Sequence, residues 1–323
     1  MSELPLIRLR EVRKHYALNG GLLGPKRLVK AVDGVSFDIQ PGETFGLVGE
    51  SGCGKSTVGR AILRLFDITS GDIAFAGQEI AHASEKTLKP LRRRMQAIFQ
   101  DPWSSLNPGM TVQQLVAEPM KIHGYDAQTQ RERAAEMLDK VGLKSEHLTR
   151  FPHEFSGGQR QRISIARALS VNPEFVLCDE PLSALDVSVQ AQVVNILQDL
   201  QQELGLTYLF IAHDLSMVRH ISSRIGVMYL GKLVEVAPAG ELYQRPAHPY
   251  TQALLASVPV PDPRVRQLEE GGLKGEIPSP TADIRGCRFC SRCPHVMPQC
   301  QQQEPPMQEI APRHFAACWL FKV

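Results

Sequence analysis

The sequence lacks a long apolar run, a marked excess of either charge and a recognisable export signal. No stretch approaches the ~20 consecutive apolar residues that a membrane-spanning helix needs. The formal net charge is only +2, which gives no reason to expect nucleic acid as a partner. The first residues, Met1–Leu6, contain no basic region followed by an apolar core, so we expect no secretory signal. These absences predict a chain that stays in the cytosol and reaches a membrane only by docking on partner proteins.

What is present is ordinary for a globular protein, with one exception. The 323 residues are 43% hydrophobic and 22% charged, enough for one large or two medium-sized domains with a full core. Of the seven cysteines, five lie between Cys287 and Cys318, in a tail rich in proline and glycine. Structural disulfides are rare in a reducing compartment, so this cluster calls for another explanation.

The stretch Gly49–Thr57 has the spacing G-x-x-x-x-G-K-[ST], the pattern of a phosphate-binding loop. An apolar run at 44–48 precedes it and predicts a buried strand, and helical spacing follows at 58–65. Glycines let successive N–H groups point at phosphate oxygens, and the positive end of the following helix adds to the attraction. We expect Lys55 to reach the β- and γ-phosphates and Ser56 to ligate Mg²⁺. The residues assigned to phosphate binding are Gly49, Glu50, Ser51, Gly52, Cys53, Gly54, Lys55, Ser56 and Thr57.

Short apolar runs that alternate with helical periodicity predict an α/β fold. The order strand, helix, strand implies right-handed crossovers and a mostly parallel core sheet. Between 101 and about 170 the pattern is helical, and we interpret this stretch as an inserted helical subdomain. Strands are expected at 6–16, 35–39, 44–48, 72–75, 95–100, 175–178, 207–211 and 225–230, and helices at 58–65, 111–122, 129–141 and 189–204.

Two acidic residues follow the apolar run Phe175–Cys178. Asp179, at the tip of a buried strand, can bind Mg²⁺ directly or through water, and Glu180 can polarise an attacking water. The alternative is a strand followed by a solvated acidic turn, which the phosphate loop upstream disfavours.

A second helix start suited to an anion is predicted just after Phe155. Two adjacent glycines expose backbone N–H groups, and Ser156 is a natural N-cap for a helix that continues to Leu169. A capped helix without a ligand is the alternative. Because one domain does not need two phosphate cradles, we interpret this start as binding the nucleotide of another subunit. The residues concerned are Ser156, Gly157, Gly158 and Gln159.

Three further residues lie at or after the ends of predicted strands. His213 is placed for a γ-phosphate contact, although a histidine at a strand end is more often structural. The amide of Gln100 can touch Mg²⁺ or water. Tyr16 offers a ring that can stack on adenine, with simple edge packing as the alternative.

Taken in their order along the chain, these residues resemble the ATPase subunits of ABC transporters. Gly49–Thr57 matches the Walker A motif and Phe175–Asp179 the Walker B motif, with Cys178 in a usually aliphatic position. Phe155–Gln159 matches the signature motif, with Phe155 where leucine is usual.

The resemblance also implies a role for each remaining candidate. It makes Gln100 the Q-loop glutamine, Glu180 the catalytic glutamate and His213 the switch histidine. Tyr16 becomes the aromatic residue that stacks on adenine. Ser183–Asp186 becomes the D-loop, with Asp186 at the nucleotide. It assigns catalytic roles to Glu180, His213, Gln100 and Lys55, and Mg²⁺ binding to Ser56, Gln100 and Asp179.

Three segments outside the ATPase core narrow the resemblance to the oligopeptide/dipeptide importer subfamily. They are 99–108, 248–255 and 275–280. Within that subfamily the chain looks most like the F-type ATPase subunit of a dipeptide permease. The resemblance implies a P-loop NTPase fold: an ABC-type nucleotide-binding domain at 1–256, with a RecA-like core, an antiparallel β subdomain and the inserted helical subdomain. It further implies a cysteine-rich C-terminal extension at 257–323.

The function implied by the resemblance is hydrolysis of ATP, with Mg²⁺, to power import of dipeptides or oligopeptides. The expected partners are a second, paralogous ATPase in a heterodimer, two membrane permeases and an extracytoplasmic peptide-binding protein, but no nucleic acid. The expected location is the cytoplasmic face of the inner membrane, as a peripheral subunit.

Three alternatives to peptide import follow from the same residues. Close relatives carry nickel or opines, so the cargo can be another small solute. A soluble ABC protein acting on nucleic acid or ribosomes usually has two cassettes or a long coiled coil, and this sequence has neither. A metal-binding regulator that uses ATP only as a signal is disfavoured by the intact Glu180 and His213.

The clustered cysteines have the spacing Cys287-x2-Cys290-x2-Cys293-x6-Cys300-x17-Cys318. Four thiolates suit a [4Fe–4S] cluster or a tetrahedral Zn²⁺, and free thiols are the third possibility. The subfamily resemblance selects Cys287, Cys293, Cys300 and Cys318 as ligands, with Arg292-Cys293-Pro294 and His314 in register with the subfamily pattern. It favours [4Fe–4S] over Zn²⁺. It leaves Cys290 as a bystander or a replacement ligand. Cys53, in the phosphate loop, is interpreted as a small residue that fills the loop rather than as an oxidation-sensitive thiol.

Overall fold

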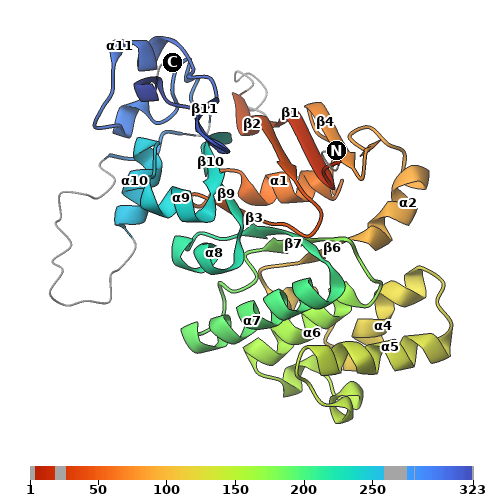
Figure 1. Ribbon diagram of the computed structural model, residues 1–323. Coiled ribbons are helices and arrows are strands. Elements are labelled where there is room, and N and C mark those ends of the chain that lie inside the picture. Colours follow the sequence, from red (N-terminus) through yellow and green to blue (C-terminus); the bar gives the residue numbers. More distant parts are fainter. Residues whose placement is uncertain (1–3, 19–26, 258–274, 280, 322–323) are drawn as a thin grey trace, which may run out of the picture. The chain divides into compact units, whose positions relative to one another are not determined.

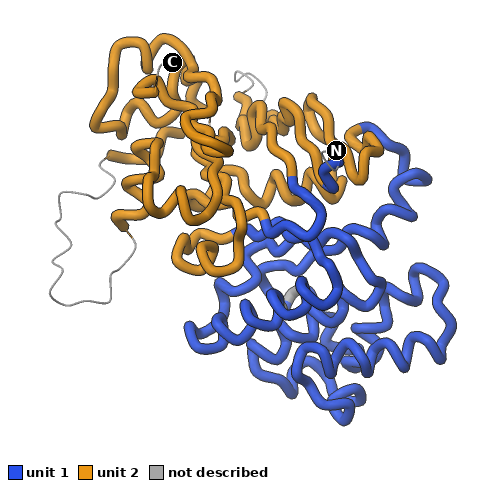
Figure 2. Tube along the Cα trace, viewed as in Figure 1, with its two compact units in different colours: residues 1–6, 39–44, 82–211 blue, residues 7–38, 45–81, 212–323 orange. Residues whose placement is uncertain are grey.

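The computed structural model describes residues 4–18, 27–257, 275–279 and 281–321. The chain divides into two compact units, each built from segments that are discontinuous in the sequence (Figure 2). Unit 1 comprises Met1–Leu6, Ile39–Thr44 and His82–Ile211, and unit 2 comprises Ile7–Asp38, Phe45–Ala81 and Ala212–Val323. The predicted helical segment therefore lies in unit 1, and the phosphate loop and the cysteine-rich segment lie in unit 2.

Unit 1 contains three parallel strands in the order β8-β7-β6. Every residue of β7 and β8 is buried, as in parallel sheets that are covered on both faces. Met95 pairs with Phe175, which pairs in turn with Thr207. The predicted parallel arrangement is confirmed for these strands. Their bounds are β6 (Met95–Ile98), β7 (Phe175–Asp179) and β8 (Thr207–Ile211).

The strand that precedes Gln100 is shorter than the sequence pattern suggests. We expected it to end at Gln100, but β6 ends at Ile98. Asp101 accepts a hydrogen bond from the Trp103 N–H (2.8 Å) and so caps a short helix, with Pro102 at its first position. Proline has no N–H to donate to a neighbouring strand but fits the first position of a helix, so this segment forms a helix and does not continue β6. Gln100 consequently lies in a bend and is exposed.

Helices make up most of unit 1, and α6 is the central one. It packs against α3, α4, α5, α7 and β6 (Figure 1). The helices predicted at 111–122 and 129–141 are confirmed as α4 and α5, and Gly142, with a φ of 69°, follows α5 in the expected way. The elements are α2 (Glu85–Arg94), α3 (Pro102–Ser105), α4 (Val112–Ile122), α5 (Ala127–Lys140), α6 (Gly157–Leu169) and α7 (Val187–Leu204), with short 3₁₀ helices η1 (Ser145–Thr149) and η2 (Pro152–Glu154).

One sheet of unit 2 has the strand order β2-β1-β4-β5. β1 and β4 are antiparallel, with Ile7 opposite Phe75, and their register shifts between Arg10 and Arg13. Glu11, inside this irregularity, has a φ of 47°, as a β-bulge requires. β4 and β5 are antiparallel as well, in agreement with the expected antiparallel β subdomain. The strands are β1 (Ile7–Leu18), β2 (Arg27–Ile39), β4 (Ser70–Phe75) and β5 (Gln78–Glu79).

The remaining strands of unit 2 follow the order β11-β12-β10-β9-β3. β3 and β9 are parallel, whereas β9, β10, β12 and β11 are antiparallel neighbours. None of the helices within the described ranges is both long and apolar enough to cross a membrane. The elements are β3 (Thr44–Val48), α1 (Lys55–Ile62), α8 (Leu215–Ile221), β9 (Arg224–Tyr229), β10 (Lys232–Pro238), α9 (Ala239–Gln244) and α10 (Pro249–Ala256).

The C-terminal segment extends this sheet instead of forming a core of its own. β12 pairs with β10, and Glu235 of β10 lies opposite Ala316. Glu235 is fully buried and accepts hydrogen bonds from the N–H groups of Ala247 (2.9 Å) and His248 (2.8 Å). Its carboxylate also lies 2.7 Å from the Nε2 atom of His314, on β12. A buried carboxylate needs such partners, so this contact fastens β12 to β10. The elements are η4 (Cys290–Arg292), α11 (Pro298–Gln302), β11 (Gln308–Ala311), β12 (His314–Ala316) and η5 (Trp319–Phe321).

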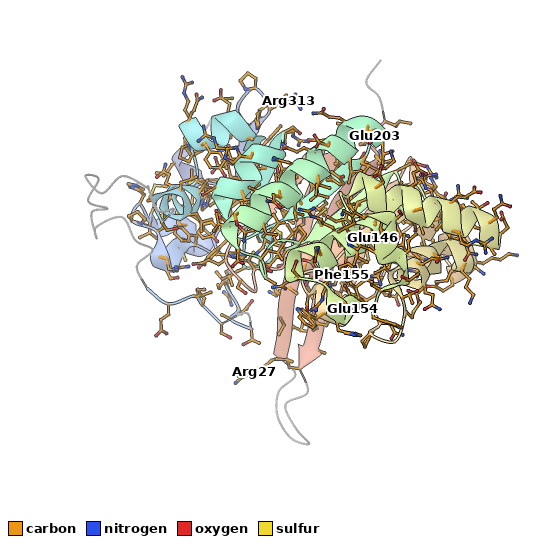
Figure 3. The ribbon with its side chains drawn as sticks, turned by 90° about the horizontal axis from the view of Figure 1, so that it is seen from below. Arg27, Glu146, Glu154, Phe155, Glu203 and Arg313 are labelled. Carbon is orange, nitrogen blue, oxygen red and sulfur yellow. The ribbon has the colours of Figure 1, made fainter. Side chains whose placement is uncertain are left out.

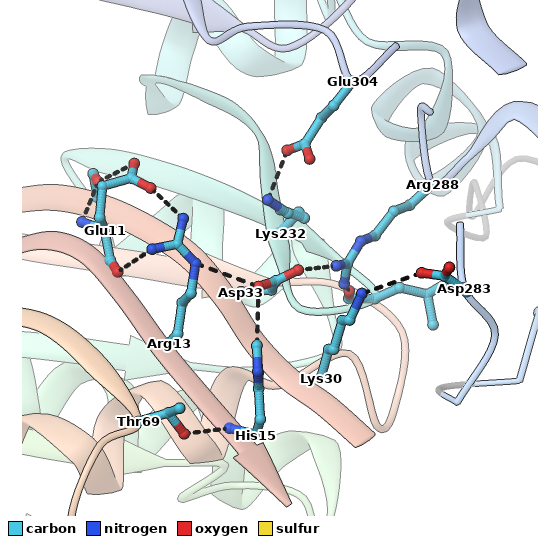
Figure 4. Close-up of polar contacts among 12 residues, drawn as sticks. Glu11, Arg13, His15, Lys30, Asp33, Thr69, Lys232, Asp283, Arg288 and Glu304 are labelled. Atoms are coloured by element: carbon cyan, nitrogen blue, oxygen red, sulfur yellow. Dashed lines mark hydrogen bonds and ion pairs between the residues drawn. The ribbon is translucent and has the colours of Figure 1, made fainter. Parts of the chain in front are cut away.

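Charged side chains connect the C-terminal segment with β2 and with β10, strands of two different sheets (Figure 4). Asp33, on β2, pairs with Arg288 and with the Nε2 atom of His15 (2.9 Å). Lys232, on β10, pairs with Glu304 at 2.7 Å. Burial by itself would raise the pKa of Asp33, but the charges of Lys232 and Arg288 lower the pKa overall. Asp33 is therefore a charged anchor for this segment at neutral pH.

Candidate functional site

The phosphate loop follows β3 and requires glycine at two positions. Gly49 and Gly54 have φ angles of 148° and 109°, a region that favours glycine. A Cβ atom at Gly49 would lie 2.2 Å from the carbonyl oxygen of Met228, and one at Gly54 would lie 2.1 Å from that of Ala31. Backbone packs directly against both glycines, so the shape of the loop depends on their lacking a side chain.

Lys55 is held inside this loop. Its side chain is buried, and Nζ donates hydrogen bonds to the carbonyl oxygens of Gly49 (2.7 Å) and Glu50 (3.2 Å). Cys53 is also buried, with Sγ 3.9 Å from Nζ of Lys55. Burial raises the pKa of the Cys53 thiol, and the nearby ammonium offsets this only in part. Cys53 is thus a neutral, space-filling residue, as the sequence indicated.

The helix after the loop begins without a capping side chain at its N-cap. α1 starts at Lys55, and its N-cap is Gly54 in the left-handed conformation. Glycine cannot accept a hydrogen bond through a side chain, so N–H groups of the first turn are left to other acceptors. Together with the helix dipole, this makes the start of α1 suitable for an anion.

Glu50 has partners that sequence reasoning missed. Its N–H donates to the hydroxyl of Tyr250 (2.8 Å), and its carboxylate oxygens lie 2.8 and 3.1 Å from two guanidinium nitrogens of Arg292. Tyr250 and Arg292 are 200 and 242 positions away in the sequence. Both stand in stretches that carry the family resemblance, but spacing along the chain gives no sign that they reach the phosphate loop.

Two other candidates of unit 2, Tyr16 and His213, are exposed. Tyr16 was expected at the end of a strand, but β1 continues beyond it. The ring of Tyr16 meets that of Phe66 edge-on, with 6.4 Å between centroids, and Nζ of Lys14 lies 4.9 Å from its centroid. His213 lies in the turn that leads to α8. Contact of either residue with a nucleotide stays a prediction.

Unit 1 carries the two acids at the tip of β7. Asp179 is the last residue of the strand and is 2% exposed. Glu180 follows with a φ of 50°; its N–H donates to the carbonyl oxygen of Ile211 (3.0 Å), and its carbonyl oxygen accepts from the Ser183 N–H (3.4 Å). A positive φ is uncommon for a residue other than glycine and persists only where surrounding bonds enforce it. The turn therefore gives the buried Asp179 and the partly exposed Glu180 separate, fixed positions.

The start of α6 confirms the predicted cap. Ser156 Oγ accepts from the Gln159 N–H (3.4 Å), and Gln159 Oε1 accepts from the Ser156 N–H (3.0 Å), which is a capping box. A Cβ atom at Gly158 would lie 2.4 Å from Cγ1 of Val189 on α7, so close helix packing requires this glycine. Phe155, labelled in Figure 3, is buried beside this start, as suits an apolar replacement of leucine.

The remaining candidates of unit 1, Gln100 and Asp186, are both exposed. The loop before Asp186 is held by Gln190, whose Nε2 atom donates to the carbonyl oxygens of Leu182 (3.0 Å) and Leu185 (2.9 Å). Sequence reasoning missed Gln190, because nothing distinguishes it from the other polar residues of α7.

The clustered cysteines approach one another in the C-terminal segment. The Cys287 N–H donates to the carbonyl oxygen of Cys300 (2.7 Å), and the Cys290 N–H donates to that of Cys287 (3.1 Å). Burial raises the pKa of Cys287 to about 12, with smaller contributions from Cys300, Cys290 and Cys318. Burial also raises the pKa values of Cys293 and Cys318, and Cys300 again contributes to both. Cys300 therefore lies within electrostatic range of each of the other three thiols expected as ligands.

A metal centre among these thiols is nevertheless unsupported. Within the part of the chain that the structure describes, no group of three or more His, Cys, Asp or Glu side chains is arranged to hold a metal ion. His314, which is in register with the cysteine pattern, pairs with Glu235 instead. All seven cysteines are unpaired. Both the iron–sulfur cluster and its zinc alternative stay predictions.

Comparison with known proteins then identifies the family. Residues 32–183 match the ABC transporter family, and residues 234–300 match the family described as oligopeptide/dipeptide transporter, C-terminal region. The chain is 55% identical over 325 residues to the putative oligopeptide transport ATP-binding protein YkfD of Bacillus subtilis (strain 168), covering 100% of this chain and 97% of the relative. The chain belongs to the ABC transporter ATP-binding subunits of the oligopeptide transport family.

Two further likenesses agree with this family of ABC ATPases. The oligopeptide transport ATP-binding protein AppF of the same Bacillus strain is 53% identical over 320 residues, which cover 98% of this chain and 97% of AppF. The dimeric ATP-binding cassette MJ0796, solved in a post-hydrolysis state with ADP and Pi, superposes with a TM-score of 0.65 at 28% identity, covering 72% of this chain and 98% of that one. This chain is therefore an ABC-type ATPase, and the expected ABC nucleotide-binding fold is confirmed.

Proposed function

We propose that this ABC ATPase powers the import of dipeptides or oligopeptides, as the F-type subunit of a dipeptide permease. The observation that carries the proposal is the match of 234–300 to the C-terminal region of oligopeptide/dipeptide transporters, on a chain that resembles oligopeptide ATP-binding proteins over its whole length. The proposed partners are a paralogous second ATPase, two membrane permeases and an extracytoplasmic peptide-binding protein. The chain would act as a peripheral subunit at the cytoplasmic face of the inner membrane.

The residues of unit 2 are assigned to nucleotide binding. Gly49–Thr57 would surround the phosphates with N–H groups, Lys55 would bind the β- and γ-phosphate oxygens and Ser56 would ligate Mg²⁺. The buried Lys55 and the start of α1 support these roles. Tyr16 would stack on adenine, and its exposed ring leaves a face for this purpose.

The acids of unit 1 are assigned to hydrolysis. Asp179 and Gln100 would hold Mg²⁺, and Glu180 would orient or deprotonate the attacking water. The fixed backbone of Glu180, with its positive φ, supports a role that depends on position. His213 would contact the γ-phosphate, and Lys55 with Mg²⁺ would offset the charge that develops in the transition state.

A second subunit would complete each nucleotide site. We assign Ser156, Gly157, Gly158 and Gln159 to the nucleotide bound by the partner ATPase, with Asp186 beside it. ATP would bind the closed pair of ATPases better than the open pair, and this difference in affinity would drive the permeases. Hydrolysis would remove the difference and reopen the pair.

A groove on the helical part of unit 1 supports docking of a permease helix. It encloses about 810 Å³ beside α4 and α5, and its lining is mainly apolar. An amphipathic helix can lay its apolar face into such a groove. The lining includes Met110, Ala117 and Ile122 together with the charged residues Glu118, Lys121 and Arg131.

In the C-terminal segment we assign Cys287, Cys293, Cys300 and Cys318 as ligands of a [4Fe–4S] cluster. The cysteine spacing and the subfamily resemblance support this assignment. When bound, the cluster would cross-link this segment, for stability or for redox sensing. Protein purified without oxygen should be brown, with broad absorption near ~400 nm and bound iron. Colourless protein with one zinc per chain would reverse the choice of metal.

Uptake of labelled peptides tests the proposed cargo. Cells that lack this subunit should lose uptake of di- and oligopeptides, and the wild-type gene should restore it. Glu180→Gln should not restore uptake, whereas Glu174→Gln, an exposed carboxylate just before β7, should do so. If these cells took up peptides normally but lost uptake of nickel or an opine, that solute and not peptides would be the cargo.

A further inference from the structure

An ion pair between Arg292 and Glu50 joins the cysteine-rich segment to the phosphate loop. Two guanidinium nitrogens face the two carboxylate oxygens at 2.8 and 3.1 Å, the bidentate geometry of a strong, charge-assisted pair. The side chain of Arg292 is 5% exposed and that of Glu50 is 21% exposed, so water and salt screen the pair only weakly. Both residues belong to unit 2.

Aromatic rings hold both partners of this pair. The guanidinium of Arg292 lies 5.9 and 6.0 Å from the ring centroids of Tyr229 and Phe289 and donates to the Tyr229 hydroxyl at 3.4 Å. Tyr250 packs against the same two rings, and its hydroxyl accepts the N–H of Glu50. One buried cluster thus fixes the side chain and the backbone of Glu50 together.

The charge of Glu50 matters because its loop is built for an anion. Glu50 is the one carboxylate within Gly49–Thr57, and Lys55 is the one cation. A carboxylate without a partner at this position would repel phosphate oxygens, and the repulsion is strong where the effective dielectric constant is low. Arg292 cancels this charge without occupying the loop itself.

We propose that Arg292 is a positioning residue for ATP, which neutralises and immobilises Glu50 and thereby makes ATP affinity depend on the C-terminal segment. This inference rests on the proposed binding of ATP at Gly49–Thr57. Arg292 lies in η4, between Cys290 and Cys293. A conformational change in the C-terminal segment therefore alters the phosphate loop through the contact of Arg292 with Glu50. By linkage, ATP binding stabilises the segment to the same extent.

The test measures the dissociation constant of a non-hydrolysable ATP analogue for the full chain and for variants of Glu50, Arg292 and control residues. Arg292→Met should bind the analogue about tenfold more weakly, because it leaves the carboxylate of Glu50 unpaired beside the phosphates. Glu50→Gln alone should bind the analogue more tightly than the wild type, because it removes a negative charge beside the phosphates. The double variant Glu50→Gln/Arg292→Met should recover to within about threefold of the wild type, because glutamine has no charge to neutralise.

This recovery separates charge compensation from simple packing. If Arg292 only filled space, the double variant would bind as weakly as Arg292→Met or more weakly. Arg292→Lys keeps a charge but loses the forked geometry, and should fall between wild type and Arg292→Met. Should Arg292→Met fail to fold, Arg292→Lys with and without Glu50→Gln gives the same comparison.

Arg288→Met is the matched control. Arg288 belongs to the same segment and forms an ion pair with Asp33, not with Glu50 (Figure 4). Its loss should leave the dissociation constant within about twofold of the wild type, although the segment loses a comparable contact. Equal weakening by Arg288→Met and Arg292→Met would overturn the inference.

Two other results bear on the inference and on the proposed site separately. A folded Arg292→Met with wild-type affinity, or a double variant without recovery, overturns the role of Arg292 and leaves the ATP site standing. Lys55→Ala with wild-type affinity overturns the ATP site itself, because Lys55 is assigned to the phosphates and contacts Glu50 at its carbonyl oxygen, not at the carboxylate that Arg292 neutralises.

Discussion

Unit 2 carries the phosphate loop, with one buried ammonium and a helix start that has no capping side chain, whereas unit 1 presents two acids at the tip of β7. The first set of groups attracts an anion, and the second suits a metal ion and an attacking water. The glycines of the loop are fixed by backbone contacts, and Glu180 is fixed by a strained turn. The difference leads us to expect that binding and hydrolysis of ATP are lost separately, by substitutions in different units.

The two helix starts differ in a related way. The N-cap of α1 is a glycine without a side chain, whereas α6 begins with a capping box between Ser156 and Gln159. The start of α6 therefore satisfies part of its backbone from within the chain, and the start of α1 depends more on other acceptors. Gly54 is needed for its left-handed conformation, and Gly158 for the close approach of Val189.

The largest expected effect is on hydrolysis, from Glu180→Gln. In the assembled transporter, ATP turnover should fall about 10²- to 10⁴-fold, because the group that orients or deprotonates water is lost. ATP affinity should stay within about twofold of the wild type, because the phosphate loop is unchanged. The control is Glu174→Gln, which removes the exposed partner of Arg94 just before β7 and should leave turnover unchanged. If Glu180→Gln hydrolysed ATP at the wild-type rate, the assignment of hydrolysis to the acids of unit 1 would be wrong.

The next effect is on binding, from Lys55→Ala. The dissociation constant for ATP should rise about 10- to 100-fold, since a charged donor to the phosphates is lost. Titration with a fluorescent ATP analogue measures this. Lys144→Ala serves as control, because the Lys144 side chain is 79% exposed, and it should leave binding unchanged. If Lys55→Ala bound ATP as tightly as the wild type, the assignment of ATP binding to unit 2 would be contradicted.

Gly158→Ala should lower the free energy of unfolding by about 2 kcal/mol, because the new Cβ atom meets Cγ1 of Val189. Chemical denaturation measures the loss. Gly157→Ala is the matched control: its Cβ atom would lie 3.6 Å from Cδ2 of Leu185, an ordinary contact, so it should be tolerated. The additional substitution Val189→Ala should relieve much of the Gly158→Ala effect. Equal losses at Gly157 and Gly158 would contradict the packing role.

The smallest effect is local, from Ser156→Ala. Loss of the capping box should cost about 1 kcal/mol at the start of α6. Hydrogen exchange of the first-turn amides should therefore speed up about fivefold in the chain alone. Ser188→Ala, at an exposed position of α7, should not change it. Unchanged exchange in Ser156→Ala would mean that the start of α6 has no more internal support than that of α1.

Much of the local structure could be predicted, because it depends on neighbouring residues. The run Thr207–Ile211 consists of β-branched, aromatic and aliphatic residues, and β8 has the same bounds. Ser156 was predicted to cap α6 and does so. The errors are at strand ends: β6 stops at Ile98, before Gln100, and β1 runs past Tyr16. Propensity alone does not tell where a partner strand stops pairing.

Contacts between distant segments could not be predicted. The pairing of His314 with Glu235 is an example: the sequence placed His314 in register with the cysteines, but the path of β12 brings it to a buried carboxylate. The pair of Arg292 and Glu50 is another, since each residue by itself is an ordinary surface charge in a sequence. Burial makes both pairs important, because a buried charge without a partner is costly.

The sequence by itself determined that the chain is an ATPase of the ABC class, because a phosphate loop, a capped glycine helix start and an acidic strand tip are short patterns with their own chemistry. Only the tertiary structure decided that the C-terminal segment reaches the phosphate loop through Arg292. It also decided that α7 packs so close to Gly158 that Val189 leaves no room there for a side chain. The reason is physical. Turns, caps and loops form from residues a few positions apart, whereas the partner of a buried charge is chosen by the path of the whole chain.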